Sequence, residues 1–187
     1  VDAIEVARLC SQLACGFFYR WVEDGPADWM AARKAWAGRV SATLAHSRTL
    51  DTPAQVQARA ENEGWPEWST WKAVRDSFEP VTEPIWLDDS MVKICLRWAE
   101  KNRGVIWSPH RAFGERLEAA GLRYFGEEGL DRTGALIDHC RDRVVAASAT
   151  SCTTGHNLQH AWARCLVVLP YASPKWWEQM IGRFHRP

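Results

Sequence analysis

The chain has 187 residues, 47% of them hydrophobic and 25% charged, and its 23 basic residues balance 23 acidic ones. This length is enough to bury a full core, and the zero net charge excludes the long-range basic field that gathers nucleic acid unaided. The sequence shows neither a leader with a basic start and an apolar core nor an apolar run near eighteen residues. We therefore expect no signal peptide, no membrane span and a cytoplasmic location.

The first 86 residues are rich in tryptophan and predict helices. Seven of the 12 tryptophans lie here, and Trp29, Ala32, Trp36 and Val40 recur at the three- and four-residue steps of a helix over 28–45. Proline-containing breaks separate this helix from its neighbours, at Gly25-Pro26, Thr52-Pro53, Glu79-Pro80 and Glu83-Pro84. We expect residues 1–86 to form a helical, tryptophan-rich extension.

From residue 87 onward, helical patterns alternate with short apolar runs. A helix capped by Asp88 or Asp89 ends before Gly104, and Val105-Ile106-Trp107 follows as a buried strand. The same alternation predicts helices over 88–101, 111–121, 131–141 and 174–184, and strands over 105–107, 122–125, 143–148 and 164–169. Such alternation is typical of an α/β domain, here 87–187, whose mainly parallel sheet has helices on both faces. Ligands of these sheets bind at the carboxyl ends of the strands.

One strand end carries a run of small polar residues, from Ser148 to Leu158. Hydroxyls, a glycine and an amide at this place offer hydrogen-bond donors to a phosphate or a sugar. An ordinary loop capped by serine and threonine has the same composition.

The final predicted helix carries two arginines on one face. Gln179, Arg183 and Arg186 fall at positions i, i+4 and i+7, and Gly182 between them lets another backbone approach closely. A guanidinium is permanently charged, planar and able to donate two hydrogen bonds at once, which suits a phosphoryl group. A solvated basic end of a helix explains the same residues.

Four segments, taken in order, resemble the motifs of a helicase family. Val105 to Ser108, Tyr124 to Gly126, Ser148 to Leu158 and Gln179 to Arg186 are similar to motifs IV, IVa, V and VI of superfamily-two helicases. The closest likeness is to Swi/Snf-like DNA translocases, including phage and bacterial members, whose last motif often reads Gly-Arg-Thr-His-Arg-Pro-Gly-Gln. This chain has Gly182-Arg183-Phe184-His185-Arg186-Pro187. Residues 88–187 are thus identified as similar to the second RecA-like domain of such an enzyme.

The resemblance implies roles for individual residues. Arg183 and Arg186 would be arginine fingers that reach ATP from across a domain cleft, with Gln179 supporting the nucleotide or the interface. Gly155 and Asn157 would lie near the ribose or the domain interface, and Gly182 would also belong to the nucleotide site. The backbone of one strand of double-stranded DNA would follow Ser108, His110, Ser148 and Thr150. Where family members usually have a glycine pair in motif V, this chain has Cys152-Thr153-Thr154.

The sequence lacks the other half of an ATP site. None of the five lysines lies in a GxxxxGK[ST] loop, and no predicted strand ends in an acidic pair suited to Mg²⁺. The resemblance therefore implies that ATP and Mg²⁺ are shared with an N-terminal RecA-like domain of the same protein, in a bacterium or a phage-infected cell. We expect these 187 residues alone not to hydrolyse ATP.

Other interpretations remain open. Cys152, His156 and His160, with His139 or Cys140, could be drawn as a zinc site, although buried free thiols and no metal are what we expect. The tryptophans could stack on single-stranded nucleic acid, although a core role suits their spacing better, and one of Trp176 and Trp177 is expected to contact another domain or DNA. A degenerate helicase fold acting as a non-catalytic adaptor is the second functional class. A nucleoside-phosphate kinase would need its own phosphate loop.

Overall fold

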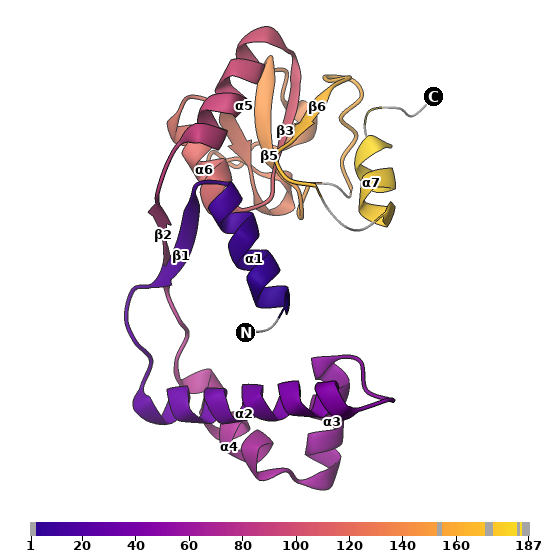
Figure 1. The fold of residues 1–187 in the computed structure, drawn as a ribbon. Helices are drawn as coiled ribbons and strands as arrows, with labels where there is room; N and C mark the ends of the chain where they lie inside the picture. Colours follow the sequence, from indigo (N-terminus) through magenta and orange to yellow (C-terminus); the bar gives the residue numbers. More distant parts are fainter. Residues whose placement is uncertain (1–2, 153–154, 171–173, 183, 185–187) are drawn as a thin grey trace. The chain divides into compact units, whose positions relative to one another are not determined.

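The computed structural model describes residues 3–152, 155–170, 174–182 and 184, and its contacts divide the chain into two compact units (Figure 1). The helical unit consists of Tyr19–Glu83. The sheet unit consists of Ile4–Phe18 and the described residues from Pro84 onward. The helical unit is thus an insertion in the chain of the sheet unit, whereas the sequence predicted an extension before it.

The helical unit is built from three helices around buried tryptophans. The expected helix over 28–45 is confirmed as the longest of them, α2. Trp29 is 3% exposed, and its ring packs edge-on against Trp71 and Phe78 with centroids 5.1 and 5.3 Å away. Large aromatic rings bury much area per residue, which gives this small unit a core. Its helices are α2 (Ala27–His46), α3 (Pro53–Glu63) and α4 (Pro66–Val74), followed by a 3₁₀ turn, η1 (Arg75–Ser77).

Two strands lie where the sequence predicted only helices. β1 (Phe17–Trp21) and β2 (Thr82–Trp86) form a two-stranded sheet through which the chain enters and leaves the helical unit. Four of the five residues of β1 are aromatic, which favours an extended strand. Pro84 lies inside β2, and its missing N–H is tolerated because a two-stranded sheet consists of edges. The expected break at Glu83-Pro84 is therefore part of a strand.

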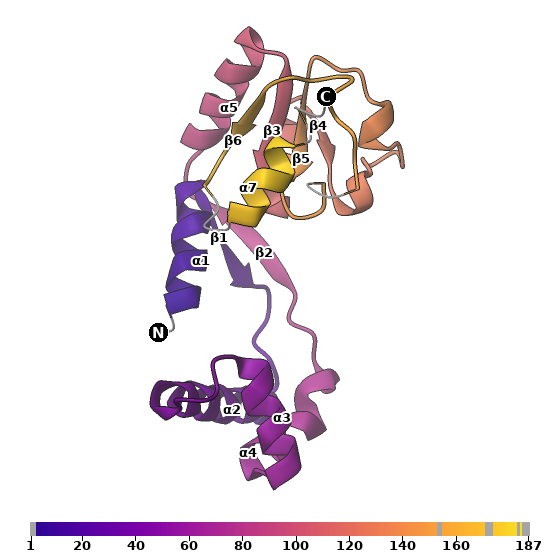
Figure 2. The ribbon, with the colours of Figure 1, turned by 90° about the vertical axis from the view of Figure 1, so that its right-hand side faces the viewer.

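The sheet unit contains a four-stranded parallel sheet in the order β4-β5-β3-β6 (Figure 2). Its strands match the predicted ones closely. The two central strands, β3 and β5, are buried along their whole length, which explains their continuous apolar sequence. The strands are β3 (Gly104–Ser108), β4 (Arg123–Phe125), β5 (Val144–Ser148) and β6 (Cys165–Val167).

Helices flank both faces of this sheet (Figures 1 and 2). On one face, Val105, Trp107, Val145 and Ala147 share a core with Met180 and other residues near the C-terminal end. The alternate strand residues face the opposite way, where two helices confirm the predictions for 88–101 and 111–121. The helices are α5 (Ser90–Lys101), α6 (Arg111–Ala119) and α7 (Pro174–Ile181), and an N-terminal helix, α1 (Ala3–Ala14), also belongs mainly to this unit.

The helix predicted over 131–141 is wrong. This segment contains turns and a 3₁₀ turn, η3 (Ile137–His139), and a second such turn, η2 (Glu127–Gly129), precedes it. The Asp131 side chain accepts hydrogen bonds from the backbone N–H groups of Thr133 and Ala135, both at 2.9 Å, and Gly134 has a φ of +81°. A carboxylate that takes backbone donors in this way replaces the helical partners of those groups. The apolar residues of 131–141 therefore lie in a folded loop, although their spacing in the sequence is that of a helix.

Candidate functional site

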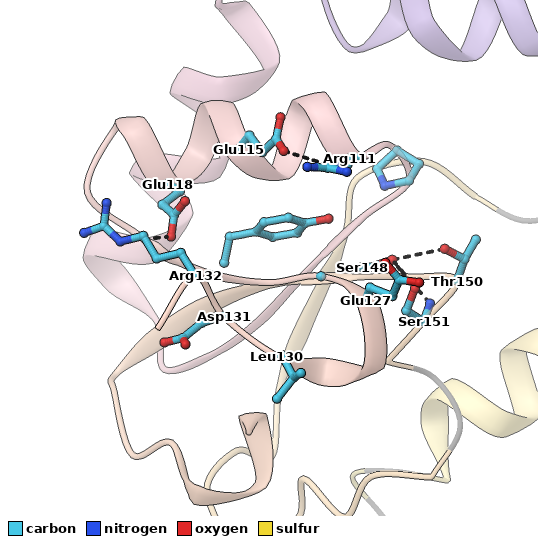
Figure 3. Close-up of a pocket in the computed structure, with 13 residues that line it drawn as sticks. Arg111, Glu115, Glu118, Glu127, Leu130, Asp131, Arg132, Ser148, Thr150 and Ser151 are labelled. Carbon is cyan, nitrogen blue, oxygen red and sulfur yellow. Dashed lines mark hydrogen bonds and ion pairs between the residues drawn. The ribbon is translucent and has the colours of Figure 1, made fainter. Parts of the chain in front are cut away.

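A hollow of about 570 Å³ lies at the carboxyl ends of β3, β4 and β5, where the parallel sheet is expected to bind ligands (Figure 3). Its walls come from α6, from the loop after β4 and from the loop after β5. The lining residues that carry polar or charged side chains are Arg111, Glu115, Glu118, Tyr124, Glu127, Asp131, Arg132, Ser148, Thr150 and Ser151.

Three hydroxyls form a cluster at the end of β5. The Ser148 hydroxyl lies 3.0 Å from that of Thr150 and 3.3 Å from that of Ser151, and it accepts a hydrogen bond from the Ser151 N–H. Ser148 is 9% exposed while Thr150 is exposed, so the cluster reaches from the core to the surface. Hydroxyl hydrogens rotate, so such a cluster can turn a donor toward an incoming phosphate oxygen. Ser148 and Thr150, two of the predicted DNA-contacting residues, thus lie in one hydroxyl cluster.

Tyr124 adds a neutral phenol to this cluster. Burial raises the pKa of Tyr124 to about 12, against the opposing effect of its hydrogen bond with Ser148. The ring lies directly against Gly114 of α6, where an added Cβ would come within 2.1 Å of a ring carbon. The glycine thus lets α6 approach β4 closely enough to fix the ring. The sequence prediction did not include Tyr124 or Ser151 among the site residues.

The charges around the hollow do not make it basic. Arg111 pairs with Glu115 at 2.7 Å, and Arg132 lies 3.8 Å from Glu118 (Figure 3). Glu127 and Asp131 bring the carboxylates of the lining to four, against two guanidiniums. A polyanion is therefore not drawn into the hollow by charge, and the hydroxyl cluster at its edge is the better place for a phosphate.

Ser108 and His110 are not among the residues that line this hollow. Ser108 is 2% exposed, and its hydroxyl donates to the His110 carbonyl at 2.7 Å. The His110 ring lies 2.8 Å from the Ser11 hydroxyl and packs edge-on against Phe17. Burial lowers the pKa of His110, against the opposing effect of its hydrogen bond with Ser11, and so favours the neutral ring. Both residues shape the start of α6, and neither lines the hollow with Ser148.

Gly155 and Asn157 lie in a segment that Asp138 holds. Gly155 has a φ of +82° and open space beside it, which suits glycine. The Asp138 carboxylate accepts from the backbone N–H of Asn157 at 2.8 Å and lies 2.6 Å from Nδ1 of His156. Asn157 is exposed, and its side-chain amide lies 3.1 Å from Nε2 of His160. The sequence prediction missed Asp138 because it placed that residue in a helix.

The helix α7 is tied to the end of β5. Trp176 donates from its indole N–H to the carbonyl of Ala149 at 3.0 Å, and Phe184 lies 6.3 Å from Trp107, ring to ring. Gln179 is half-buried on this helix. The N–H of Gly182 donates to the carbonyl of Glu178 at 2.9 Å, which extends the hydrogen bonding of the helix by one residue. Arg183 and Arg186, the predicted arginine fingers, lie outside the described residues.

Four residues of the alternative zinc site, Cys140, Cys152, His156 and His160, make other contacts. Within the described parts of the chain, no three His, Cys, Asp or Glu side chains are grouped to hold a metal ion. Cys152 is buried and its thiol points to the carbonyls of Phe125 and Gly126, and burial raises its pKa to about 12. All six cysteines are free, but only four are buried, since Cys10 is exposed and Cys165 is partly exposed. None of the described helices combines the length and apolarity that crossing a membrane requires.

The strand ends of this sheet therefore gather three of the four predicted motif segments, and α7 brings the start of the fourth to the segment after β5. The hydroxyls at the end of β5 can donate hydrogen bonds to phosphate and sugar oxygens. Comparisons with protein families, curated proteins and solved structures found no match for this chain.

Proposed function

We propose that the sheet unit is the second RecA-like domain of an ATP-dependent DNA translocase or helicase of the Swi/Snf-like kind. The observation that carries the proposal is the hydrogen bond between Trp176 and Ala149. It joins the helix that precedes Arg183 to the residue between Ser148 and Thr150. A helix presenting arginines to a nucleotide and a loop contacting DNA need such a firm connection, because the enzyme must couple hydrolysis to movement.

In this proposal the chain supplies one wall of a shared ATP site. Arg183 and Arg186 stabilise the charge that develops on the transferring phosphoryl group, with Gln179 supporting them from α7. Gly155, Asn157 and Gly182 contact the nucleotide or the facing domain. ATP supplies the free energy, and the phosphate loop and the Mg²⁺ ligands come from an N-terminal RecA-like domain, since the sequence of this chain contains no phosphate loop.

The DNA contacts proposed for this chain use hydrogen-bond donors more than charge. Thr150 is the exposed end of the hydroxyl cluster, with the buried Ser148 and the half-buried Ser151 beside it. Ser108 and His110 act indirectly, by fixing the turn from β3 into α6. Contacts of this kind to phosphates position a duplex without reading its sequence, as a translocase requires. The even charge balance is consistent with a domain that binds DNA only together with its partner domain.

The test replaces each arginine in a protein that contains this chain and its partner domain. Arg183→Ala or Arg186→Ala is expected to lower the kcat of DNA-stimulated ATP hydrolysis by about 10³-fold or more, because an arginine finger acts in the transition state. Steady-state hydrolysis is measured with and without double-stranded DNA.

Arg97→Ala is the matched control, since Arg97 is an exposed arginine of α5. It should leave turnover unchanged. Unchanged turnover in both finger variants would contradict the proposal and favour the non-catalytic adaptor.

A further inference from the structure

The segment after β5 is held by a single carboxylate. Asp138 accepts hydrogen bonds at both oxygens, from the His156 ring at 2.6 Å and from the backbone N–H of Asn157 at 2.8 Å. These two contacts cross 18 and 19 residues of sequence and fix consecutive residues of the segment. A carboxylate that bonds a ring and the next backbone amide sets both the position and the direction of the chain there.

The carboxylate itself is rigidly placed. Asp138 lies in η3 beside Ile137, which is fully buried in the core under the sheet, and two residues before Cys140, which is 3% exposed in the same core. Its side chain is 31% exposed and that of His156 is 12% exposed, so both are partly shielded from water. Burial favours the neutral acid, but the bonds from His156 and Asn157 outweigh it and lower the pKa of Asp138.

The imidazole ring of His156 also contacts a third segment, the turn after β4. Gly129, in the turn after β4, has a φ of +70°, and a Cβ added to it would lie 2.4 Å from Cε1 and Nε2 of His156. The imidazole therefore rests directly on the backbone of that turn. One histidine thus links η3, the loop after β4 and the segment after β5.

We propose that Asp138 and His156 are positioning residues that hold Gly155 and Asn157 in the conformation needed to contact the nucleotide. This inference rests on the function proposed above, in which Asn157 contacts the nucleotide or the facing domain, and it commits to the nucleotide. Asn157 then receives two constraints, the Asp138 carboxylate at its backbone and His160 at its side chain. Neither Asp138 nor His156 itself touches the nucleotide in this scheme.

The first experiment uses this chain alone and follows amide hydrogen exchange. Asp138→Ala removes both bonds and is expected to speed exchange of the amides of 155–160 by about tenfold or more, as loss of a charged hydrogen bond implies. The amides of β3 and β5 should keep their protection. Asp142→Ala is the matched control, because Asp142 is a carboxylate of the same loop with a 51% exposed side chain. Unchanged exchange at 155–160 in Asp138→Ala would overturn the inference.

The second experiment measures ATP hydrolysis by the protein that includes the partner domain. Asp138→Ala and His156→Ala should raise the KM for ATP by about tenfold with a much smaller change in kcat, the reverse of the effect of Arg183→Ala. His156→Asn, which keeps a side-chain N–H near the position of Nδ1, should restore most of the affinity.

The outcomes separate the two proposals. A wild-type protein without ATPase activity rejects the proposed function and the nucleotide role together. An active wild-type protein whose KM is unchanged in both alanine variants rejects the positioning role and leaves the proposed function standing. Faster exchange with a raised KM, rescued by His156→Asn, supports both.

Discussion

At the scale of single residues, Asp131 shows how one side chain can organise a loop. Its side chain is 2% exposed, with Oδ1 accepting from Thr133 and Ala135 and Oδ2 from Nε of Arg123 at 2.5 Å. Burial favours the neutral acid, but these hydrogen bonds outweigh it and hold the pKa of Asp131 well below its ordinary range. The ionised Asp131 carboxylate therefore stabilises the folded loop.

Asp131→Asn should lower the free energy of unfolding at pH 7 by about 3 kcal/mol, because it leaves Arg123 without its buried partner. A carboxyl whose pKa is depressed in the folded state stabilises the protein above its unfolded pKa of about 3.9 and loses this effect as pH falls toward the folded pKa. The difference between wild type and variant should therefore shrink below about pH 4. Urea denaturation at pH 7, 4 and 3 measures it, and a difference that stays constant across this range would contradict the assignment.

At the scale of elements, the contact between α6 and β4 depends on a residue without a side chain. Gly114 lies in α6 under the Tyr124 ring, with no room for a Cβ. Gly38 in α2 is the opposite case, because it is exposed and nothing lies within 4 Å of an added Cβ. The same residue type is thus required by packing in one helix and is merely permitted in the other.

Gly114→Ala should destabilise the sheet unit by about 2 kcal/mol, since the core must shift to accept the methyl group. Gly38→Ala should instead stabilise the helical unit by about 1 kcal/mol, because alanine is the better helix former. Thermal unfolding followed by circular dichroism compares the two variants. Equal effects would mean that helix propensity, rather than the Tyr124 contact, decides both.

At the scale of the whole molecule, each of the two units has a core of its own. The helical unit centres on Trp29 and Trp68, and the sheet unit on Trp107 and the strands around it. The chain passes between them through β1 and β2, and the N–H of Val22 donates to the carbonyl of Val81 at 2.9 Å. This hydrogen bond brings the two ends of the insertion together.

Replacing residues 23–80 by Asn-Gly should therefore leave a folded sheet unit. Asn-Gly forms the tight turn that joins two paired strands, and Val22 and Val81 are already adjacent. The shortened chain is expected to unfold in one cooperative transition and to lose the helical signal of the insertion. Calorimetry and circular dichroism on the shortened and complete chains measure this. A shortened chain without a cooperative transition would show that the sheet unit needs the insertion to fold.

Much of the sheet was predictable because its determinants are local. Short stretches of sequence determine several elements: the apolar runs predict β3 and β5, the apolar spacing predicts α2, and the residues at its two ends predict α5. The structure confirms these elements. The helix predicted over 131–141 failed because the Asp131 side chain competes for backbone donors, which apolar spacing does not reveal. β1 and β2 were missed because each depends on a partner more than 60 residues away.

The candidate site, too, has features that the sequence determines and features that depend on contacts between distant residues. The sequence alone determined its residue types and their order, with hydroxyls after one strand and two arginines in the last predicted helix. The local backbone at the strand ends sets two short contacts, since Ser148 bonds Thr150 and the Ser108 hydroxyl donates to the His110 carbonyl, each two residues away. The tertiary structure decided which distant residues meet. It alone placed Asp138 against His156 and Asn157 and joined Trp176 to Ala149. The physical reason is that a hydrogen bond depends on distance and direction in space, which only the packing of distant segments sets.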